Sequence, residues 1–335
     1  MRRLGPVVEL GAPMLLIVAA GLLATVVSRS TQIYVLQAIV AVAIVVAIYV
    51  FIGNSGVLSF GQVSFVAVGA FAAGVMTVPL LLKAAILRDL FPILRDHELG
   101  NLPSLALATC IGALLAAVVG LPLMRLSGLA AGIATFAVLE ITNNLLREWT
   151  RIGPGATTLS LVPQTTGPGQ ATVGALLVVG VAFAYQRSRF GRRLRATRED
   201  PAAAQAVGIS VHRQRLGAFV LSGALCGFAG GLYVHMLGSI STGQVYLELA
   251  FLTLAMLVVG GMTSLWGAVV GALAVSALDS FLSEAERGVD LGITLSLPDG
   301  SRLVVVGAVM ALVLVLRPSG LTGGRELSLP RRMRS

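Results

Sequence analysis

The sequence has little charge. Only 12% of its 335 residues are Asp, Glu, Lys or Arg, whereas a soluble domain carries about a quarter. Lysine is almost absent, because Lys83 is the single one and lies between Leu82 and Ala84. A phosphate-binding P-loop needs its lysine between a glycine and a serine or threonine. The chain therefore lacks this ATP-hydrolysing motif.

Cysteine and histidine are also scarce. Cys110 and Cys226 both fall in apolar stretches, where we expect small core residues rather than a disulfide or a metal site. The histidines, His97, His212 and His235, lie far apart, and none has a second ligand at metal-binding spacing. The serines show no nucleophile elbow. These absences argue against an enzyme, and we expect no metal or cofactor in this chain.

Long apolar runs dominate what is present. Hydrophobic residues make up 56% of the chain, and several runs reach the roughly 20 residues that cross a bilayer as a helix. A β-barrel would instead show alternating segments of about ten residues. We predict an all-α, polytopic transmembrane helical bundle of about 8–10 spans, forming a single domain over 1–335. The candidate spans are 7–28, 33–52, 61–82, 103–124, 128–146, 170–186, 214–236, 246–263, 265–282 and 301–317.

Arginine is distributed unevenly among the loops. With the N-terminus inside, the cytoplasmic loops hold about twice as many basic residues as the outer loops, as the positive-inside rule requires. The main contributors are a cytoplasmic loop at 187–213 and a basic C-terminal tail at 318–335. We therefore expect both termini in the cytoplasm. The net charge of +9 reflects this bias, so we expect the lipid bilayer and no nucleic acid as a partner.

Small residues recur four positions apart in three of the spans. Such rows let helix backbones approach closely in lipid, where packing replaces the hydrophobic effect. They predict a tight bundle rather than an active site. The rows are Gly112, Ala116 and Gly120; Gly223, Gly227 and Gly231; and Gly267 with Gly271.

Two glycine-rich stretches interrupt the apolar pattern, one at 53–62 and the other at 260–267. Backbone that leaves a helix at membrane depth must be buried in protein or line a polar cavity. Each stretch is therefore either a tight turn between two spans or part of a translocation path. In the first stretch, Asn54, Ser59 and Gln62 are the side chains that would face such a path.

Few carboxylates fall inside the spans. Glu140 and Asn144 share a helix face by their spacing, and either they face a translocation path or partner subunit, or they lie at the wet outer interface. Arg147 follows closely, which favours the interface. Glu248 and Asp279 lie near span ends, and we expect them to be interface groups too.

The loop at 187–213 contains one short, well-delimited helix. Asp200 is a preferred N-cap, Pro201 fits the first helical position, and Gly208 can take the positive φ that ends a helix. Glu199 adds negative charge at the positive end of the helix dipole.

This helix, 201–207, has about two turns and is too short to be stable alone in water. It must therefore dock, either on its own cytoplasmic loops or, through small side chains such as Ala203 and Ala204, in the groove of another protein.

The segment resembles the cytoplasmic "EAA" loop of bacterial ABC importer permeases, whose coupling helix docks into the ATPase subunit. The family pattern is Glu-Ala-Ala, three residues and then Gly. Ala203, Ala204 and Gly208 match it, whereas Ala202 occupies the glutamate position.

Other stretches resemble the permeases for branched-chain amino acids, over about 50–320. Four stretches carry the resemblance to this family as a whole: "NSGVLSFGQVSFVAVGAF", "GRRLRATREDPAAAQAVGI", "GGMTSLWGAVVGA" and "LRPSGLTG". "RLSGLAAGIATFAVLEI" followed by "RIGPGATTL" is similar to the second of the two paired permeases in these systems.

The resemblance implies a permease subunit of a high-affinity importer in the bacterial inner membrane. It implies a homologous permease as heterodimer partner, two ATPase chains that use the ATP, and an extracytoplasmic solute-binding protein. It assigns coupling to six residues: Glu199, Asp200, Pro201, Ala203, Ala204 and Gly208. Bulky residues at Gly208 or Ala204 should then uncouple ATP hydrolysis from uptake.

Alternatives remain at this point. Permeases for urea, short-chain amides and sugars share the architecture. An ion-coupled secondary transporter would need carboxylates deep in the membrane or paired broken helices, for which Glu140 is the single candidate.

Overall fold

The computed structural model describes residues 4–87, 89–286, 289–290, 294–295, 301–317, 319–324 and 326. Each of the ten predicted spans overlaps one main helix, which confirms the all-α, polytopic membrane bundle. These helices are α1 (Leu4–Val26), α2 (Arg29–Ser55), α3 (Gln62–Thr77), α6 (Asn101–Leu123), α7 (Gly128–Glu148), α8 (Pro168–Arg187), α11 (Val211–Leu237), α12 (Leu247–Gly260), α13 (Leu265–Glu286) and α14 (Ser301–Leu316). Within the described residues seven are long and apolar enough to cross a membrane, and α3, α12 and α14 are shorter apolar helices.

The predicted span at 61–82 is too long. α3 ends at Thr77 because Pro79 lacks the N–H that would continue the helix and restricts the residue before it. Two short helices follow, α4 (Leu80–Ile86) and α5 (Pro92–Arg95). The lysine Lys83 lies here, donates to the carbonyl oxygens of Leu94 and His97, and has its pKa lowered by burial.

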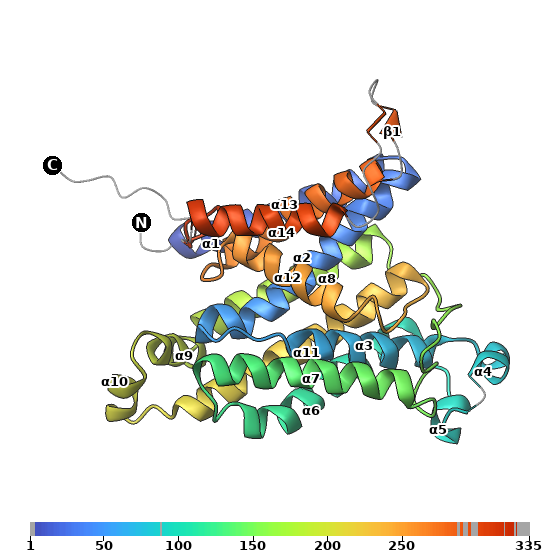
Figure 1. Ribbon diagram of the computed structural model, residues 1–335, viewed down its shortest axis with the longest axis horizontal. Coiled ribbons are helices and arrows are strands. Elements are labelled where there is room, and N and C mark those ends of the chain that lie inside the picture. Colours follow the sequence, from blue (N-terminus) through green and yellow to red (C-terminus); the bar gives the residue numbers. More distant parts are fainter. Residues whose placement is uncertain are drawn as a thin grey trace.

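Helix α11 is the centre of the bundle and packs on α2, α3 and α6 (Figure 1). The predicted glycine rows make these contacts. A Cβ placed on Gly227 would lie 2.3 Å from the Ala108 carbonyl oxygen, and one on Gly112 would lie 2.5 Å from that of Gly223. Of the two cysteines, Cys226 is buried as expected, but Cys110 is exposed on the outward side of α6, so its assignment to the core is wrong.

The bundle has two distinct ends (Figure 1). The α10 end carries two further helices, α9 (Arg189–Glu199) and α10 (Pro201–Ala206). Glu9 pairs with Arg187 at this end, and Glu326 accepts from Gln186. The opposite end carries α4, α5 and an antiparallel pair of two-residue strands, β1 (Val289–Asp290) and β2 (Thr294–Leu295).

The second glycine-rich stretch is a tight turn. It joins α12 to α13, and segment 319–324 covers it. The Leu321 N–H donates to the Val259 carbonyl oxygen, and the Thr322 hydroxyl donates to the Gly260 carbonyl oxygen. Helices α12 and α13 then cross closely, since a Cβ on Gly271 would lie 2.0 Å from the Met256 carbonyl oxygen.

The predicted division into one domain over 1–335 stays a prediction. Its coupling loop at 187–213 is described throughout. Of the predicted basic tail at 318–335, residues 318, 325 and 327–335 lie outside the described residues.

Candidate functional site: the α10 helix and the cavity behind it

Helix α10 has the local structure that its sequence predicts. The Asp200 carboxylate accepts from the backbone N–H groups of Ala202 and Ala203, at 2.9 and 3.0 Å, and Pro201 occupies the first turn. Gly208 has a φ of 81°, which only glycine adopts without strain. The N-terminal end of the helix is therefore capped by the Asp200 side chain, and the C-terminal end by the backbone conformation of Gly208.

The exposed side of α10 is mostly small and apolar, with the polar Gln205 among its residues. Ala202 and Ala203 are exposed, Val207 is 75% exposed, and no atom of the described residues lies within 4 Å of a Cβ placed on Gly208. Ala204 instead is 4% exposed and packs on the chain itself. Docking on the chain itself is thus confirmed for the Ala204 face of α10, whereas docking of the exposed face in the groove of another protein stays a prediction.

Helix α9 holds α10 against the bundle, and the sequence prediction had left it as loop. The Ser188 hydroxyl caps it by accepting from the Gly191 N–H, Leu194 is buried, and the Arg195 guanidinium donates to the Gln186 carbonyl at 2.9 Å. Three other arginines of α9 are exposed, namely Arg189, Arg192 and Arg193.

Arg198 joins these helices to the bundle interior. Its guanidinium donates to the Gly53 carbonyl at 2.8 Å, and it pairs with Glu199 at 2.7 Å. Its aliphatic stem covers Gly56, where an added Cβ would lie 2.7 Å from Arg198 Cγ. Sequence reasoning missed this residue, since one arginine among the eight at 187–215 carries no signal of a tertiary contact.

The first glycine-rich stretch is an open connection rather than a tight turn. α2 ends at Ser55, Gly56 follows with a φ of 70°, and α3 begins at Gln62. The intervening backbone runs back along α7, where the Phe60 N–H donates to the Thr135 hydroxyl. We call residues 56–61 the α2–α3 connection.

Three polar side chains predicted for a translocation path lie around this connection. Asn54, Ser59 and Gln62 are at most 2% exposed. Among the described residues, the Asn54 Oδ1, the Ser59 hydroxyl and both amide atoms of Gln62 have no hydrogen-bond partner. Buried polar atoms without a partner are costly, so these groups are suited to bind water or a polar solute.

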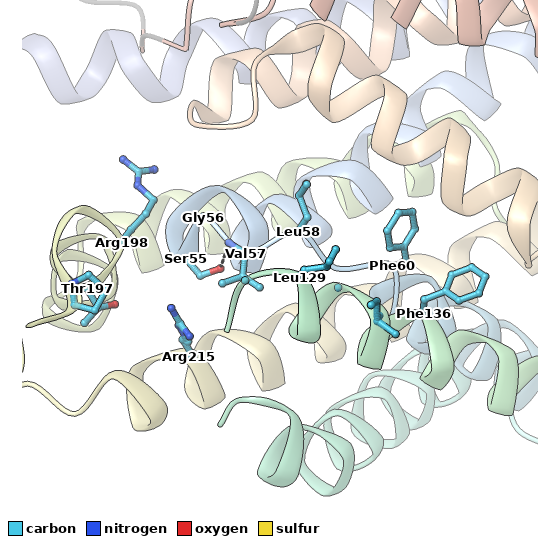
Figure 2. A pocket seen from close by; sticks show the side chains of 14 residues that line it. Ser55, Gly56, Val57, Leu58, Phe60, Leu129, Phe136, Thr197, Arg198 and Arg215 are labelled. Carbon is cyan, nitrogen blue, oxygen red and sulfur yellow. Dashed lines mark hydrogen bonds between the residues drawn. The ribbon is translucent and has the colours of Figure 1, made fainter. Parts of the chain in front are cut away.

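A cavity of about 690 Å³ is lined by the α2–α3 connection, by α7, and by Thr197, Arg198, Pro201 and Arg215 (Figure 2). Its walls are mostly apolar and come from the α2–α3 connection and from Leu129, Ile133 and Phe136 of α7. Arg198 and Arg215 lie at the end near α9. The Arg215 guanidinium donates to the Leu126 carbonyl, and its Nε has no partner among the described residues.

The other two predicted path residues lie apart from this group. Asn144 donates to Glu140 at 2.9 Å, and Glu140 also accepts from the Tyr246 hydroxyl of the segment before α12. Glu140 is five residues beyond Thr135, or about 7.5 Å along the helix. The structure thus brings Asn54, Ser59 and Gln62 to one region but leaves Glu140 and Asn144 nearer the opposite end.

The arrangement defines a multi-pass membrane protein with a short, partly free helix at one end, tied by one arginine to an irregular connection inside the bundle. The chain belongs to the family described as the permease component of branched-chain amino acid transport systems, whose model matches residues 30–314.

Curated relatives agree with this family. The chain is 26% identical over 330 residues to the high-affinity branched-chain amino acid transport system permease protein LivM of Escherichia coli, covering 88% of this chain and 70% of LivM. It is 32% identical over 154 residues to a permease protein of Methanocaldococcus jannaschii named as a probable LivH, covering 44% of this chain and 45% of that one. It is 31% identical over 143 residues to the xylose transport system permease protein XylH of Escherichia coli, covering 41% of this chain and 34% of XylH.

The chain thus spans a little under half of the LivH relative and about two thirds of LivM. No solved structure matches the chain significantly.

Proposed function

We propose that this chain is the membrane-spanning permease of an ABC importer for branched-chain or related aliphatic amino acids. The observation that carries the proposal is α10, a capped helix with a free apolar face, fastened by Arg198 to the α2–α3 connection. A partly exposed apolar helix face of this kind is suited to a partner protein.

The partner that fits is a separate ATPase, because the chain itself lacks a P-loop motif. In this proposal two such ATPases bind at the α10 end and hydrolyse ATP. A second, homologous permease completes the path as a heterodimer, and an extracytoplasmic binding protein delivers the substrate at the opposite end. The coverage of LivM, twice that of LivH, supports the second-permease type.

The mechanism follows from the contacts. Movement of the ATPases would displace α10, and α9 would move with it because both pack as one unit on the bundle. Arg198 would then pull on Gly53 and Gly56 at the start of the α2–α3 connection. The unpartnered polar groups of Asn54, Ser59 and Gln62 lie where such a displacement would alter access.

The α10 end is proposed to face the cytoplasm of a bacterial inner membrane. This orientation places both Glu9 and Glu326, near the two ends of the chain, on the cytoplasmic side. It also places the arginines of α9 there, as the positive-inside rule requires.

A sugar is the second candidate substrate, and the similarity to the xylose permease favours it over urea or amides. An ion-coupled secondary transporter is the competing class, although Glu140 is committed to Asn144 and Tyr246.

The test is uptake by proteoliposomes that contain this chain with its co-encoded permease, ATPases and binding protein. We expect ATP to drive accumulation of labelled leucine, without effect of a proton ionophore. Uptake of xylose instead of leucine would contradict the substrate, and uptake that is independent of ATP and collapses with the proton gradient would contradict the importer.

A further inference from the structure

A polar cavity of about 390 Å³ lies between α2, α13 and α14, at the end of the bundle opposite α10. It contains both signs of charge within a small space. The side chains that matter for binding are Tyr34, Gln37, Asp279, Ser280, Glu284 and Arg302.

Arg302 is the cation of this cavity, and carboxylates surround it. It pairs with Glu248 of α12, and its Nε lies 3.4 Å from Asp279 Oδ1. That second contact is too long and poorly aligned for a hydrogen bond, and Asp279 Oδ1 is buried without any partner among the described residues. Glu284 also lies in the wall, where its carboxylate accepts from the Tyr34 hydroxyl. Together with Glu248, which pairs with Arg302, three carboxylates lie near one guanidinium, an excess of negative charge that a second cation would balance.

A smaller cavity of about 70 Å³ adjoins the first, and Gln37, Asp279 and Ser280 line both. Most of its remaining wall is aliphatic, formed by Ala41, Ile44, Leu249, Leu252 and Met256. Its volume would hold a few water molecules or a short aliphatic chain.

Ser276 supplies an independent sign that this inner cavity is meant to be filled. It lines the cavity, its side chain is 6% exposed, and its hydroxyl has no hydrogen-bond partner among the described residues. A buried hydroxyl without a partner costs free energy that a ligand or its water can recover.

We propose that these two cavities together form a binding site for an aliphatic α-amino acid in its zwitterionic form. The ammonium group binds Asp279 and Glu284, the carboxylate binds Arg302, and the side chain enters the aliphatic cavity beside Ser276. The exchange keeps charge balanced, because the ligand carboxylate takes the place of Asp279 at Arg302 while the ligand ammonium becomes the partner of Asp279, and Glu248 keeps its ion pair with Arg302. The inference rests on the proposed function, since it names where the proposed substrate is held.

A purely structural ion-pair network explains less of this geometry. Such a network would pair Asp279 fully with Arg302 and would not need an aliphatic cavity behind it. Here Asp279 Oδ1 accepts no hydrogen bond and the Ser276 hydroxyl has no partner among the described residues, and the aliphatic wall of the inner cavity lies beside both.

The test uses the assembled importer in proteoliposomes, with Ser280→Cys as reporter and Cys110→Ser to remove the exposed native thiol. Cys226 is buried and stays. The labelling rate of the reporter with a small thiosulfonate reagent is measured against leucine, glycine and xylose, and labelled leucine uptake is measured in the same vesicles. We expect leucine to slow labelling and xylose not to.

Two substitutions test the assigned roles. Asp279→Asn should raise the leucine concentration needed for half-protection about tenfold or more, since a charge-assisted contact is lost. Ser276→Leu should fill the aliphatic cavity, so that glycine still protects while leucine no longer does. Retained glycine protection shows that the variant is folded. The control Glu9→Gln removes an ion pair at the α10 end and should leave protection by leucine and protection by glycine unchanged.

The outcomes separate the two proposals. Leucine uptake without protection of the reporter, or protection that Asp279→Asn and Ser276→Leu leave unchanged, overturns this site while the importer stands. Xylose uptake together with protection by xylose alone overturns the amino-acid substrate and this site together.

Discussion

At the scale of single residues, Arg198 carries the most specific contact between α10 and the bundle. It donates to the Gly53 carbonyl and covers Gly56. Because the side chain is 24% exposed, the hydrogen bond is largely shielded from water. One residue thus links two segments that are 145 positions apart in the sequence.

We predict that Arg198→Ala reduces substrate moved per ATP in the assembled importer and lowers the stability of the α10 end by about 2 kcal/mol. The control is Arg193→Ala, because Arg193 is exposed on the same helix. Uptake and phosphate release are measured in the same proteoliposomes. Equal coupling in the two variants would show that Arg198 does not transmit the movement.

A second residue-scale prediction concerns Asp200. Replacing this N-cap by alanine removes two hydrogen bonds and should cost about 1 kcal/mol of helix stability. Because α10 is so short, its amides should exchange with deuterium several times faster in Asp200→Ala. Glu199→Gln removes a neighbouring charge without touching the cap and is the matched control. Unchanged exchange in Asp200→Ala would mean that packing, not capping, holds the helix.

The residues that sequence could predict are those whose role is local. Asp200, Pro201 and Gly208 follow capping rules that need only their neighbours in the chain, and all three adopt the predicted geometry. Arg198 and Ala204 could not be assigned in this way. Whether Ala204 points into the chain or outward depends on where α9 and α11 lie, which no short-range pattern contains.

At the scale of elements, α11 is held by backbone-to-backbone approach. Gly223 and Gly227 lie against α6. Gly69 of α3 meets Gly227 from another side, since a Cβ added to Gly69 would lie 2.4 Å from the Gly227 carbonyl oxygen. Small residues at one crossing therefore fix the mutual positions of three helices.

We predict that Gly227→Val prevents this packing or costs about 1–3 kcal/mol, because its side chain would meet backbone rather than a movable side chain. Gly217→Ala, on the same helix with no atom within 4 Å of its added Cβ, should be neutral or slightly stabilising. Thermal unfolding of the two variants in detergent provides the comparison. Equal melting temperatures would contradict the close crossing.

Helix positions were predictable to a few residues because apolar length marks a span. The residues at which the helices begin and end were less predictable. Pro79 stops α3 after Thr77, and the connection at 56–61 leaves the helix without a tight turn. The end of α3 follows from Pro79, whereas at 56–61 the local sequence permits helix or loop and the packing against α7 decides. The same limit applies to the ion pairs of Arg302 with Glu248 and Asp279, because these residues lie far apart in the sequence. The expectation that both carboxylates are interface groups stays a prediction.

At the scale of the whole molecule, the two ends of the bundle carry different chemistry. The α10 end presents arginines and a free apolar helix face, and the opposite end presents the mixed-charge cavity around Arg302. Between them lie the unpartnered groups of Asn54, Ser59 and Gln62. This polarity fits a transport path whose energy source and substrate act at opposite ends.

The central claim is that the exposed face of α10 receives the movement of an ATPase. The structure refines which position tests it. Ala204 is buried within the chain, so a bulky residue there would disturb α10 itself, whereas the side chain of Ala203 is exposed.

The most direct measurement is therefore leucine moved per ATP hydrolysed by the reconstituted importer carrying Ala203→Trp, compared with Ala196→Trp on the exposed side of α9. We predict that Ala203→Trp inserts into the membrane normally and lowers the ratio about tenfold or more, while Ala196→Trp keeps it. An unchanged ratio for Ala203→Trp would contradict the account.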